Sequence, residues 1–351
     1  MLRVPYGHEE LEFMVQPWFD VDVVESAPAT PVGDLATAAR ASLAAPLGSK
    51  RLRDLAADVA HAVGSRRPRA IIAVTDPTSA CPDGVLVPPL LDELNAGGIG
   101  GEDITIIVAV GVHRPMSDAE RTTQRIVKDA DLVIATGIVE PHEYMGYSGG
   151  GGIRFCINVV TDDRGRVVAV ASGDPDAVLS DLAAKAAAIH TRPIAKQYDI
   201  AIAGVGAPTD VNLYQASRAA THLRFAPTPV VREGGSIIVP AKLDEGAGEG
   251  AEEQRFLHVL ESAASPAAVV EAARRHPEGG EQRAVMVALT LQHCQIVVAA
   301  SEAPEVVRLA KLRAAVDVEE ALDIAYEHIG RPARASVLLV PRAIHTLPVV
   351  A

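Results

Sequence analysis

Two histidines, His113 and His142, each come shortly after an apolar stretch that has the length of a β-strand. In an open parallel sheet, ligands bind just outside the carboxyl ends of the strands, so residues that follow neighbouring strands can face one cavity. Two imidazoles on opposite sides of a substrate can donate and accept protons, because imidazole titrates near neutral pH. Each histidine alone is more commonly a loop residue bonded to a backbone carbonyl, but the shared placement favours a proton-transfer pair.

A glycine-rich stretch, Gly-Tyr-Ser-Gly-Gly-Gly-Gly at 146–152, begins four residues after His142. Its four consecutive glycines allow backbone N–H groups to turn toward an anion such as phosphate or carboxylate. No Gly-Lys-Ser/Thr follows, so the stretch is not a P-loop, and the alternative is a flexible connector. We expect an anionic group of a ligand to be bound by Ser148, Gly149, Gly150 and Gly151.

Six polar residues elsewhere are expected to contact the substrate. The first three follow expected strands, and the other three share an expected helix: Asp76, Ser79, Arg114, Tyr214, Gln215 and Arg218. Gln215 and Arg218 are three residues apart, so they share one face of that helix and can reach a substrate carboxylate. From the pattern alone, an ordinary solvent-facing helix surface is the favoured interpretation of these two residues.

The composition argues against several classes of function. A net charge of −13 repels phosphate backbones, which argues against a nucleic-acid partner. Three scattered cysteines and the lack of a His-x-x-x-His or Cys-x-x-Cys pair argue against a preformed zinc site. No apolar run approaches the roughly 18 residues of a membrane helix, and the N-terminus does not resemble a signal peptide. We expect a cytoplasmic protein with a small anionic substrate and no nucleic-acid or membrane partner; oligomer formation stays open.

Apolar stretches of strand length alternate with helical patterns along the chain, which is typical of a parallel sheet covered on both faces. Strands are expected at 69–74, 104–110, 132–136, 198–203, 236–240, 295–299 and 336–340, with a hairpin formed by 157–160 and 167–171. Helices are expected at 86–95, 118–128, 175–189, 214–223, 252–264, 266–275 and 318–329.

The length of 351 residues predicts two domains. We expect two Rossmann-like α/β domains with parallel sheets around a central cleft. The first, 1–192, carries the histidine pair and the glycine loop, and the second, 193–351, closes the cleft. The last strand, at 336–340, can pair in either domain.

Short motifs along nearly the whole chain, taken in order, are similar to those of the nickel-dependent lactate racemase family. They include Val4-Pro5-Tyr6-Gly7, Gly111-Val112-His113-Arg114-Pro115-Met116, Glu140-Pro141-His142, Asn158-Val159-Val160, Gly173-Asp174-Pro175 and Glu245-Gly246-Ala247-Gly248. The resemblance implies two α/β domains around a cleft and chemistry at the α-carbon of a 2-hydroxy acid. In that family a nickel pincer nucleotide takes the α-hydride, and two histidines, which correspond to His113 and His142, handle the hydroxyl proton.

The chain departs from this family at the positions that hold the cofactor and the substrate carboxylate. Ser79 stands where the family has an arginine, and Gly152 stands where the family has the lysine that carries the cofactor covalently. A block with the nickel-binding histidine is missing after Gly152, and Arg218 replaces a family lysine while keeping its charge. The metal ligands are therefore unassigned. We expect no covalently attached cofactor, and a nickel pincer nucleotide held non-covalently stays an alternative.

Three hypotheses follow. The first is an isomerase of the racemase or epimerase type that uses His113 and His142 for proton transfer on a small carboxylate-bearing substrate such as a 2-hydroxy acid; lyase-type proton transfer stays open. The second is a 2-hydroxyacid racemase that binds its nickel pincer nucleotide without a covalent bond. The third is a non-catalytic protein that binds a small molecule.

Overall fold

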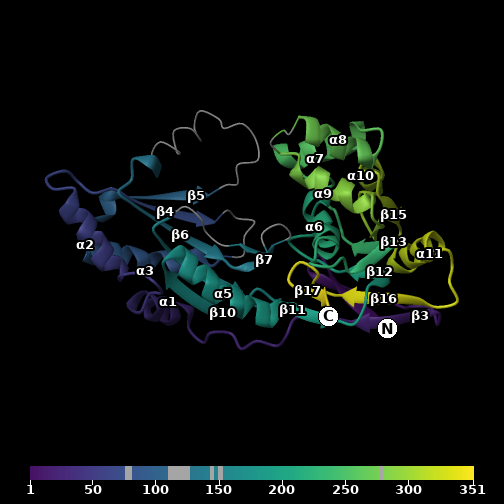
Figure 1. Cartoon of the computed structure of the whole chain (residues 1–351), viewed down its shortest axis with the longest axis horizontal. Helices are drawn as coiled ribbons and strands as arrows, with labels where there is room; N and C mark the ends of the chain where they lie inside the picture. The colour runs from purple at the N-terminus through teal and green to yellow at the C-terminus, as the bar shows by residue number, and fades with distance from the viewer. Residues whose placement is uncertain (76–80, 110–126, 143–145, 149–152, 277, 279) are drawn as a thin grey trace. The chain divides into compact units, whose positions relative to one another are not determined.

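The structure is a computed structural model, and it describes residues 1–351 except 76–80, 110–126, 143–145, 149–152, 277 and 279. The chain forms two compact units (Figure 1). Ala27–His190 form one unit, here called the inserted unit. Met1–Ser26 and Thr191–Ala351 form the other, the terminal unit.

The inserted unit is built on a five-stranded sheet with the order β10-β9-β6-β4-β5. The strands are β4 (Ala70–Thr75), β5 (Ile104–Ala109), β6 (Leu132–Ile138), β9 (Phe155–Thr161) and β10 (Val167–Gly173). Neighbouring strands are parallel except β10, which runs antiparallel to β9. Strand β6 is followed by a short antiparallel pair, β7 (Glu140–His142) and β8 (Gly146–Ser148).

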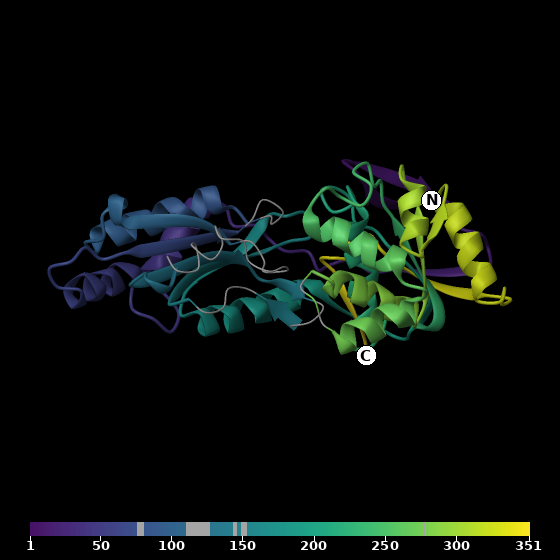
Figure 2. The ribbon, with the colours of Figure 1, turned by 90° about the horizontal axis from the view of Figure 1, so that it is seen from above.

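Helices pack on both faces of this sheet (Figure 2). One face carries α1 (Leu35–Ala44), α2 (Leu52–Ala62) and α3 (Asp83–Ala96), and the other carries α5 (Pro175–His190). A short helix, η1 (Gly101–Asp103), precedes β5. Phe155, Ile157 and Val159 of β9 alternate with Cys156 and Val160, so successive side chains enter the two opposite cores. This explains why β9 is buried along its whole length.

The terminal unit is built on a parallel six-stranded sheet with the order β15-β14-β13-β12-β16-β3. Its strands are β3 (Phe19–Val23), β12 (Tyr198–Ala203), β13 (Val231–Pro240), β14 (Gln295–Ala299), β15 (Arg313–Ala315) and β16 (Ala335–Val340). Its helices are α6 (Leu213–Arg224), α7 (Ala251–Ser262), α8 (Pro266–Arg275), α9 (Gln282–Leu291), α10 (Pro304–Leu309) and α11 (Val318–His328). Two pairs complete it: β1 (Leu2–Tyr6) with β2 (Glu9–Phe13), and β11 (Thr191–Ile194) with β17 (Leu347–Val350).

The α/β class with parallel sheets agrees with the expectation from sequence. The position of the first 26 residues does not. The expected domain 1–192 includes residues 1–26, whereas these residues belong to the terminal unit. The physical reason is that β3 pairs with β16, and Val4, Phe13 and Phe19 join the same apolar core. Strand β16, which the sequence allowed in either domain, pairs with β12 and β3. No described helix combines the length and the apolar character that crossing a membrane requires.

We expect Glu93→Gln to lower the free energy of unfolding of the inserted unit at neutral pH. The variant should also lose less of that free energy than the wild type as the pH falls. Glu93 of α3 is 7% exposed, and its carboxylate accepts a hydrogen bond of 2.9 Å from Arg53 Nε of α2. The hydrogen bonds from Arg53 lower the pKa of Glu93, against the opposing effect of burial. The stabilisation is therefore present above the pKa that Glu93 has in the unfolded chain, and it is lost as the pH falls through the folded value.

The measurement is urea unfolding of the wild type and the variant at neutral pH and between about pH 3 and 5, where glutamates titrate. Asp92→Asn is the matched control, because Asp92 lies next in sequence, is exposed, and makes only a 3.6 Å surface pair with Arg40. Equal loss of stability with falling pH in wild type and Glu93→Gln would contradict the prediction.

Candidate active site

A carboxylate connects two strands of the inserted unit at their carboxyl ends. Thr75 is the last residue of β4, and its backbone N and its Oγ1 donate to Asp83 Oδ2 at 3.2 Å and 2.6 Å. Thr136 of β6 donates through Oγ1 to the other oxygen of Asp83. Asp83 begins α3, so this cluster fixes the residues on either side of 76–80. The described residues Thr75 and Asp83, on either side of 76–80, are therefore held to each other.

Cys81 lies beside this cluster and does not fit the role of a nucleophile. Burial, together with the nearby Asp83 carboxylate, raises the pKa of the Cys81 thiol to about 12. The thiolate is the reactive form of cysteine, so Cys81 is almost entirely in its unreactive form near neutral pH. Burial raises the pKa of Cys156 and Cys294 to about 12 in the same way.

The backbone of His142 lies directly beyond the carboxyl end of β6. Val139, which follows β6, donates its N–H to Val159 O at 2.8 Å, so the chain is still held against β9 at this point. β7 and β8 then pair with His142 opposite Gly146 and Glu140 opposite Ser148. This places the backbones of His142 and Ser148, two residues singled out from the sequence, on one small antiparallel pair.

The connection from this pair back to the sheet is short. β8 ends at Ser148, and β9 begins at Phe155, so only 149–154 join them. Arg154 donates its backbone N–H to Val133 O at 3.0 Å, and β9 then runs parallel to β6.

Several predicted site residues lie outside the described part of the chain. They are Asp76, Ser79, His113, Arg114, Gly149, Gly150 and Gly151. The expectation that His113 and His142 face one cavity therefore stays a prediction. The glycine loop as an anion site also stays a prediction.

In the terminal unit, α6 carries Tyr214, Gln215 and Arg218. Asn212 caps this helix by accepting the Gln215 N–H at 2.9 Å. Tyr214, Gln215 and Arg218 are each partly exposed, while Ala216, Ser217, Ala219 and Ala220 are buried. The three predicted residues therefore share the accessible side of one rigid helix.

Tyr214 is held by three neighbours. Its hydroxyl donates to Glu252 Oε2 at 3.3 Å, its ring meets Phe256 edge-on at 5.6 Å between centroids, and the Arg283 guanidinium lies 5.8 Å from its ring centroid. Burial is the main cause that raises the pKa of Tyr214, so its hydroxyl stays protonated at neutral pH. A neutral, fixed hydroxyl suits hydrogen bonding to a ligand better than proton abstraction.

Two carboxylates that organise these loops were not singled out as site residues from the sequence. They are Asp83 and Asp210. The structure shows Asp210 buried, with its Oδ2 accepting the Gly7 N–H at 2.5 Å. This bond ties the motif at residues 4–7 to the loop before α6. Asp83 comes eight residues after Thr75, and no sequence rule for that spacing predicts the contact between them.

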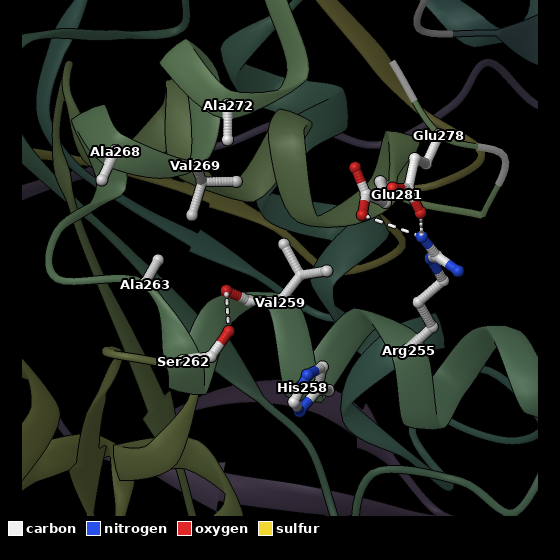
Figure 3. A pocket seen from close by; sticks show the side chains of 10 residues that line it. All are labelled: Arg255, His258, Val259, Ser262, Ala263, Ala268, Val269, Ala272, Glu278 and Glu281. Atoms are coloured by element: carbon white, nitrogen blue, oxygen red, sulfur yellow. Dashed lines mark hydrogen bonds and ion pairs between the residues drawn. The ribbon is translucent and has the colours of Figure 1, made fainter. Parts of the chain in front are cut away.

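A cavity of about 610 Å³ lies between α7, α8 and the start of α9 (Figure 3). Arg255 on its rim pairs with Glu278 and with Glu281, the latter at 3.0 Å. The lining residues, mostly apolar apart from this ion-pair cluster, do not include Tyr214, Gln215 or Arg218. The cavity is therefore separate from the residues predicted to act on a substrate.

Among the described residues there is no group of three His, Cys, Asp or Glu side chains with the geometry of a metal site. Two histidines outside the predicted pair lie against backbone carbonyls. His190 Nε2 lies 3.0 Å from Thr161 O, and His293 Nε2 lies 2.9 Å from Val231 O. These contacts are those of histidines that bond backbone carbonyls.

Comparison with known proteins gives matches over most of the chain. The family model of the lactate racemase N-terminal domain matches residues 6–124 and 120–153, and that of the lactate racemase C-terminal domain matches 194–347. A lactate racemase from Thermoanaerobacterium thermosaccharolyticum is 21% identical over 435 residues, covering 96% of this chain and 97% of the relative. This alignment is longer than the 351 residues of this chain, so the relative contains segments that this chain lacks.

Further relatives agree with these matches. A lactate racemase from Lactiplantibacillus plantarum is 23% identical over 392 residues, covering 85% of this chain and 87% of the relative. The structure of the lactate racemase apoprotein from Thermoanaerobacterium thermosaccharolyticum superposes with a TM-score of 0.80 at 20% identity, covering 99% of both chains. A structural-genomics protein from Thermotoga maritima has a TM-score of 0.56 at 14% identity, covering 87% of this chain and 99% of that one.

Proposed function

This chain belongs to the lactate racemase family, and on that premise we propose that it is an isomerase that interconverts the enantiomers of a small 2-hydroxy acid. The observation that carries the proposal is the match of both family domains, in the same order, over most of the chain. The curated relatives are themselves named lactate racemases.

The roles of individual residues follow the placement of the described elements. His142 follows β6 at its carboxyl end, where ligands of parallel sheets bind. His113 follows β5 in the sequence, and β4 lies between β5 and β6 in the sheet. We assign these two histidines the proton transfers. We assign Gln215 and Arg218 of α6 to the substrate carboxylate, since guanidinium and amide groups pair well with carboxylates.

The residues present do not fit a covalently attached nickel pincer nucleotide. Such a bond to protein needs an amine, and Gly152 has none. Between Lys128 and Lys185 the sequence has no lysine, and Lys185 is held on α5 by Asp181 at 2.7 Å. The short passage from β8 into β9 supports the same reading, because the family's metal-binding segment would have to lie there.

Proton transfer by the two histidines therefore carries the proposed chemistry. One imidazole would take a proton from the substrate, and the other would return a proton from the opposite side. This route suits a substrate whose C–H bond is already acidic. Racemisation by proton transfer exchanges the α-hydrogen with solvent, whereas hydride transfer and return preserves it.

The test is incubation of single enantiomers of a panel of 2-hydroxy acids with the protein in D₂O, followed by chiral separation and mass spectrometry. We expect the opposite enantiomer to form with deuterium at the α-carbon. Formation of the opposite enantiomer with retained protium would support the non-covalent cofactor alternative instead. Absence of interconversion across the panel, with protein prepared alongside the cofactor-synthesis enzymes, would contradict the proposed function.

We expect no nucleotide adduct on the denatured protein. The reason is the missing amine at position 152. The measurement is the intact mass of protein made together with the cofactor-synthesis enzymes, taken after denaturation. Variant Gly152→Lys is the informative partner, because it restores an amine at the matching position. An added mass of nucleotide size on the wild-type chain would show that the prediction is wrong.

A further inference from the structure

The geometry points to Asn158 as a substrate-contacting residue whose carboxamide binds the hydroxyl and carboxylate of a 2-hydroxy acid. This inference rests on the proposed function. Asn158 is fully buried in β9, and neither its Oδ1 nor its Nδ2 has a hydrogen-bond partner among the residues that the structure describes. Buried polar atoms in native proteins are nearly always hydrogen-bonded, so an amide with neither atom bonded calls for a specific explanation.

The position of Asn158 connects it with the site. Asn158 pairs with Gly137, the last but one residue of β6. The paired register between β4 and β6 runs from Ala70 opposite Leu132 to Ala73 opposite Ala135, two residues before Gly137. Asn158 is the fourth of the seven residues of β9, so its amide lies level with the carboxyl end of β6, the edge at which ligands bind in such sheets. Its pairing partner Gly137 precedes His142 by five residues.

Gly137 leaves the space that the amide occupies. A Cβ built on Gly137 would lie 3.0 Å from Asn158 Oδ1 and 3.9 Å from its Nδ2. Any side chain at 137 would displace the carboxamide, so glycine at this position and asparagine opposite it form one unit. Cys156 and Val160, on the same face of β9, are buried in the apolar core beneath α5, which makes the amide the exception on that face.

The chemistry of the amide suits a 2-hydroxy acid. A carboxamide offers an N–H donor and a carbonyl acceptor side by side. The substrate carries a carboxylate, which accepts, next to a hydroxyl, which donates. One substrate molecule can therefore satisfy both atoms of Asn158 at once, and an acid without the 2-hydroxyl leaves Oδ1 unpaired. Asn158 would thus recognise the feature that defines this substrate class.

The test compares Asn158→Leu with Ser172→Ala. Leucine has the same number and branching of side-chain heavy atoms as asparagine, without its polar atoms. Ser172 is a matched control because it is buried in the neighbouring strand β10 and has a partner, Ser42 Oγ at 2.9 Å. Thermal unfolding without ligand and calorimetric affinities for the 2-hydroxy acid that the wild type racemises, and for the same acid without its hydroxyl, are measured for each protein.

We expect Asn158→Leu to unfold at the wild-type temperature or above it, because no hydrogen bond is lost, and to bind the 2-hydroxy acid about 10- to 100-fold more weakly. Its preference over the acid without the hydroxyl should disappear. Ser172→Ala should unfold at a lower temperature and keep both the affinity and the preference. Gly137→Ala, which crowds the amide, should weaken binding in the same direction.

Wild-type affinity and preference in Asn158→Leu would overturn the inference while leaving the proposed function intact. A lower unfolding temperature with unchanged affinity would also overturn it, and would identify the amide as a structural group of the sheet. If Asn158→Leu does not fold, Gly137→Ala decides: wild-type binding by that variant overturns the inference. A wild-type chain that neither binds nor racemises any 2-hydroxy acid overturns the proposed function and this inference together.

Discussion

Replacing either His113 or His142 by alanine is expected to lower the rate of racemisation by about 10²–10⁴, the usual contribution of a positioned acid or base. Each histidine would serve one direction of proton transfer, so neither can replace the other. In D₂O the two variants should also differ from each other. The variant that lacks the base for one enantiomer should lose α-hydrogen exchange of that enantiomer and keep part of the exchange of the other.

The control is His276→Ala. His276 is exposed at the end of α8, and the contact that it makes there comes from its backbone N–H, which bonds Ala272 O. We expect this variant to racemise like the wild type. A loss of less than about tenfold in both site variants would assign the pair to binding rather than to proton transfer. A loss confined to one of them would leave a single proton donor and remove the two-sided mechanism.

The regular elements could be predicted because their hydrophobic patterns are continuous. The strands expected at 198–203 and 295–299 coincide with β12 and β14. Both are short apolar runs beside helices with clear start signals, such as Asn212 before α6. The helix expected at 175–189 coincides closely with α5, and Asp174 Oδ1 before it accepts the Ala177 N–H at 3.1 Å.

Contacts between distant parts of the chain could not be predicted in this way. Strand β3 has alternating aspartates, so its sequence does not look like part of a buried parallel sheet. Its place beside β16 depends on pairing across more than 300 residues. The helix α9 was missed because its apolar residues run almost without interruption, as in a buried helix, and a run of that kind has no amphipathic period.

The candidate site shows the same division between local pattern and distant contact. Residue types at strand ends could be read directly, as for His142 after β6. The cluster that holds the neighbouring loop could not, because it depends on Thr136 meeting Asp83 across 53 residues. The unpartnered amide of Asn158 also could not be predicted from the sequence. Whether an asparagine side chain in a strand is hydrogen-bonded depends on which groups surround it in the fold.

The second large effect is expected from Asp83. In Asp83→Ala, the N–H and hydroxyl of Thr75 and the hydroxyl of Thr136 lose their common acceptor. Hydrogen bonds to a charged group contribute about 1.5–3 kcal/mol each, but Asp83 is only half-buried and water can replace part of the loss. We expect the free energy of unfolding of the inserted unit to fall by about 2–3 kcal/mol. Activity should fall further, because the loop with Asp76 and Ser79 loses its anchor.

Asp83→Asn removes the negative charge of this side chain but keeps its shape, so the variant tests the effect of the charge alone. The amide keeps one acceptor oxygen, so we expect an intermediate loss of stability. Its informative readout is Cys81, whose thiol pKa is raised first by burial and then by the Asp83 charge. Removing the charge should lower that pKa and speed alkylation of Cys81 at mildly alkaline pH, since the thiolate is the reactive form.

Asp181→Asn, at an exposed i,i+4 pair with Lys185, is the control and should change neither stability nor alkylation measurably. Wild-type unfolding and wild-type alkylation in Asp83→Asn and Asp83→Ala would show that Thr75 and Thr136 do not depend on this carboxylate, and the loop at 76–80 would then need another anchor.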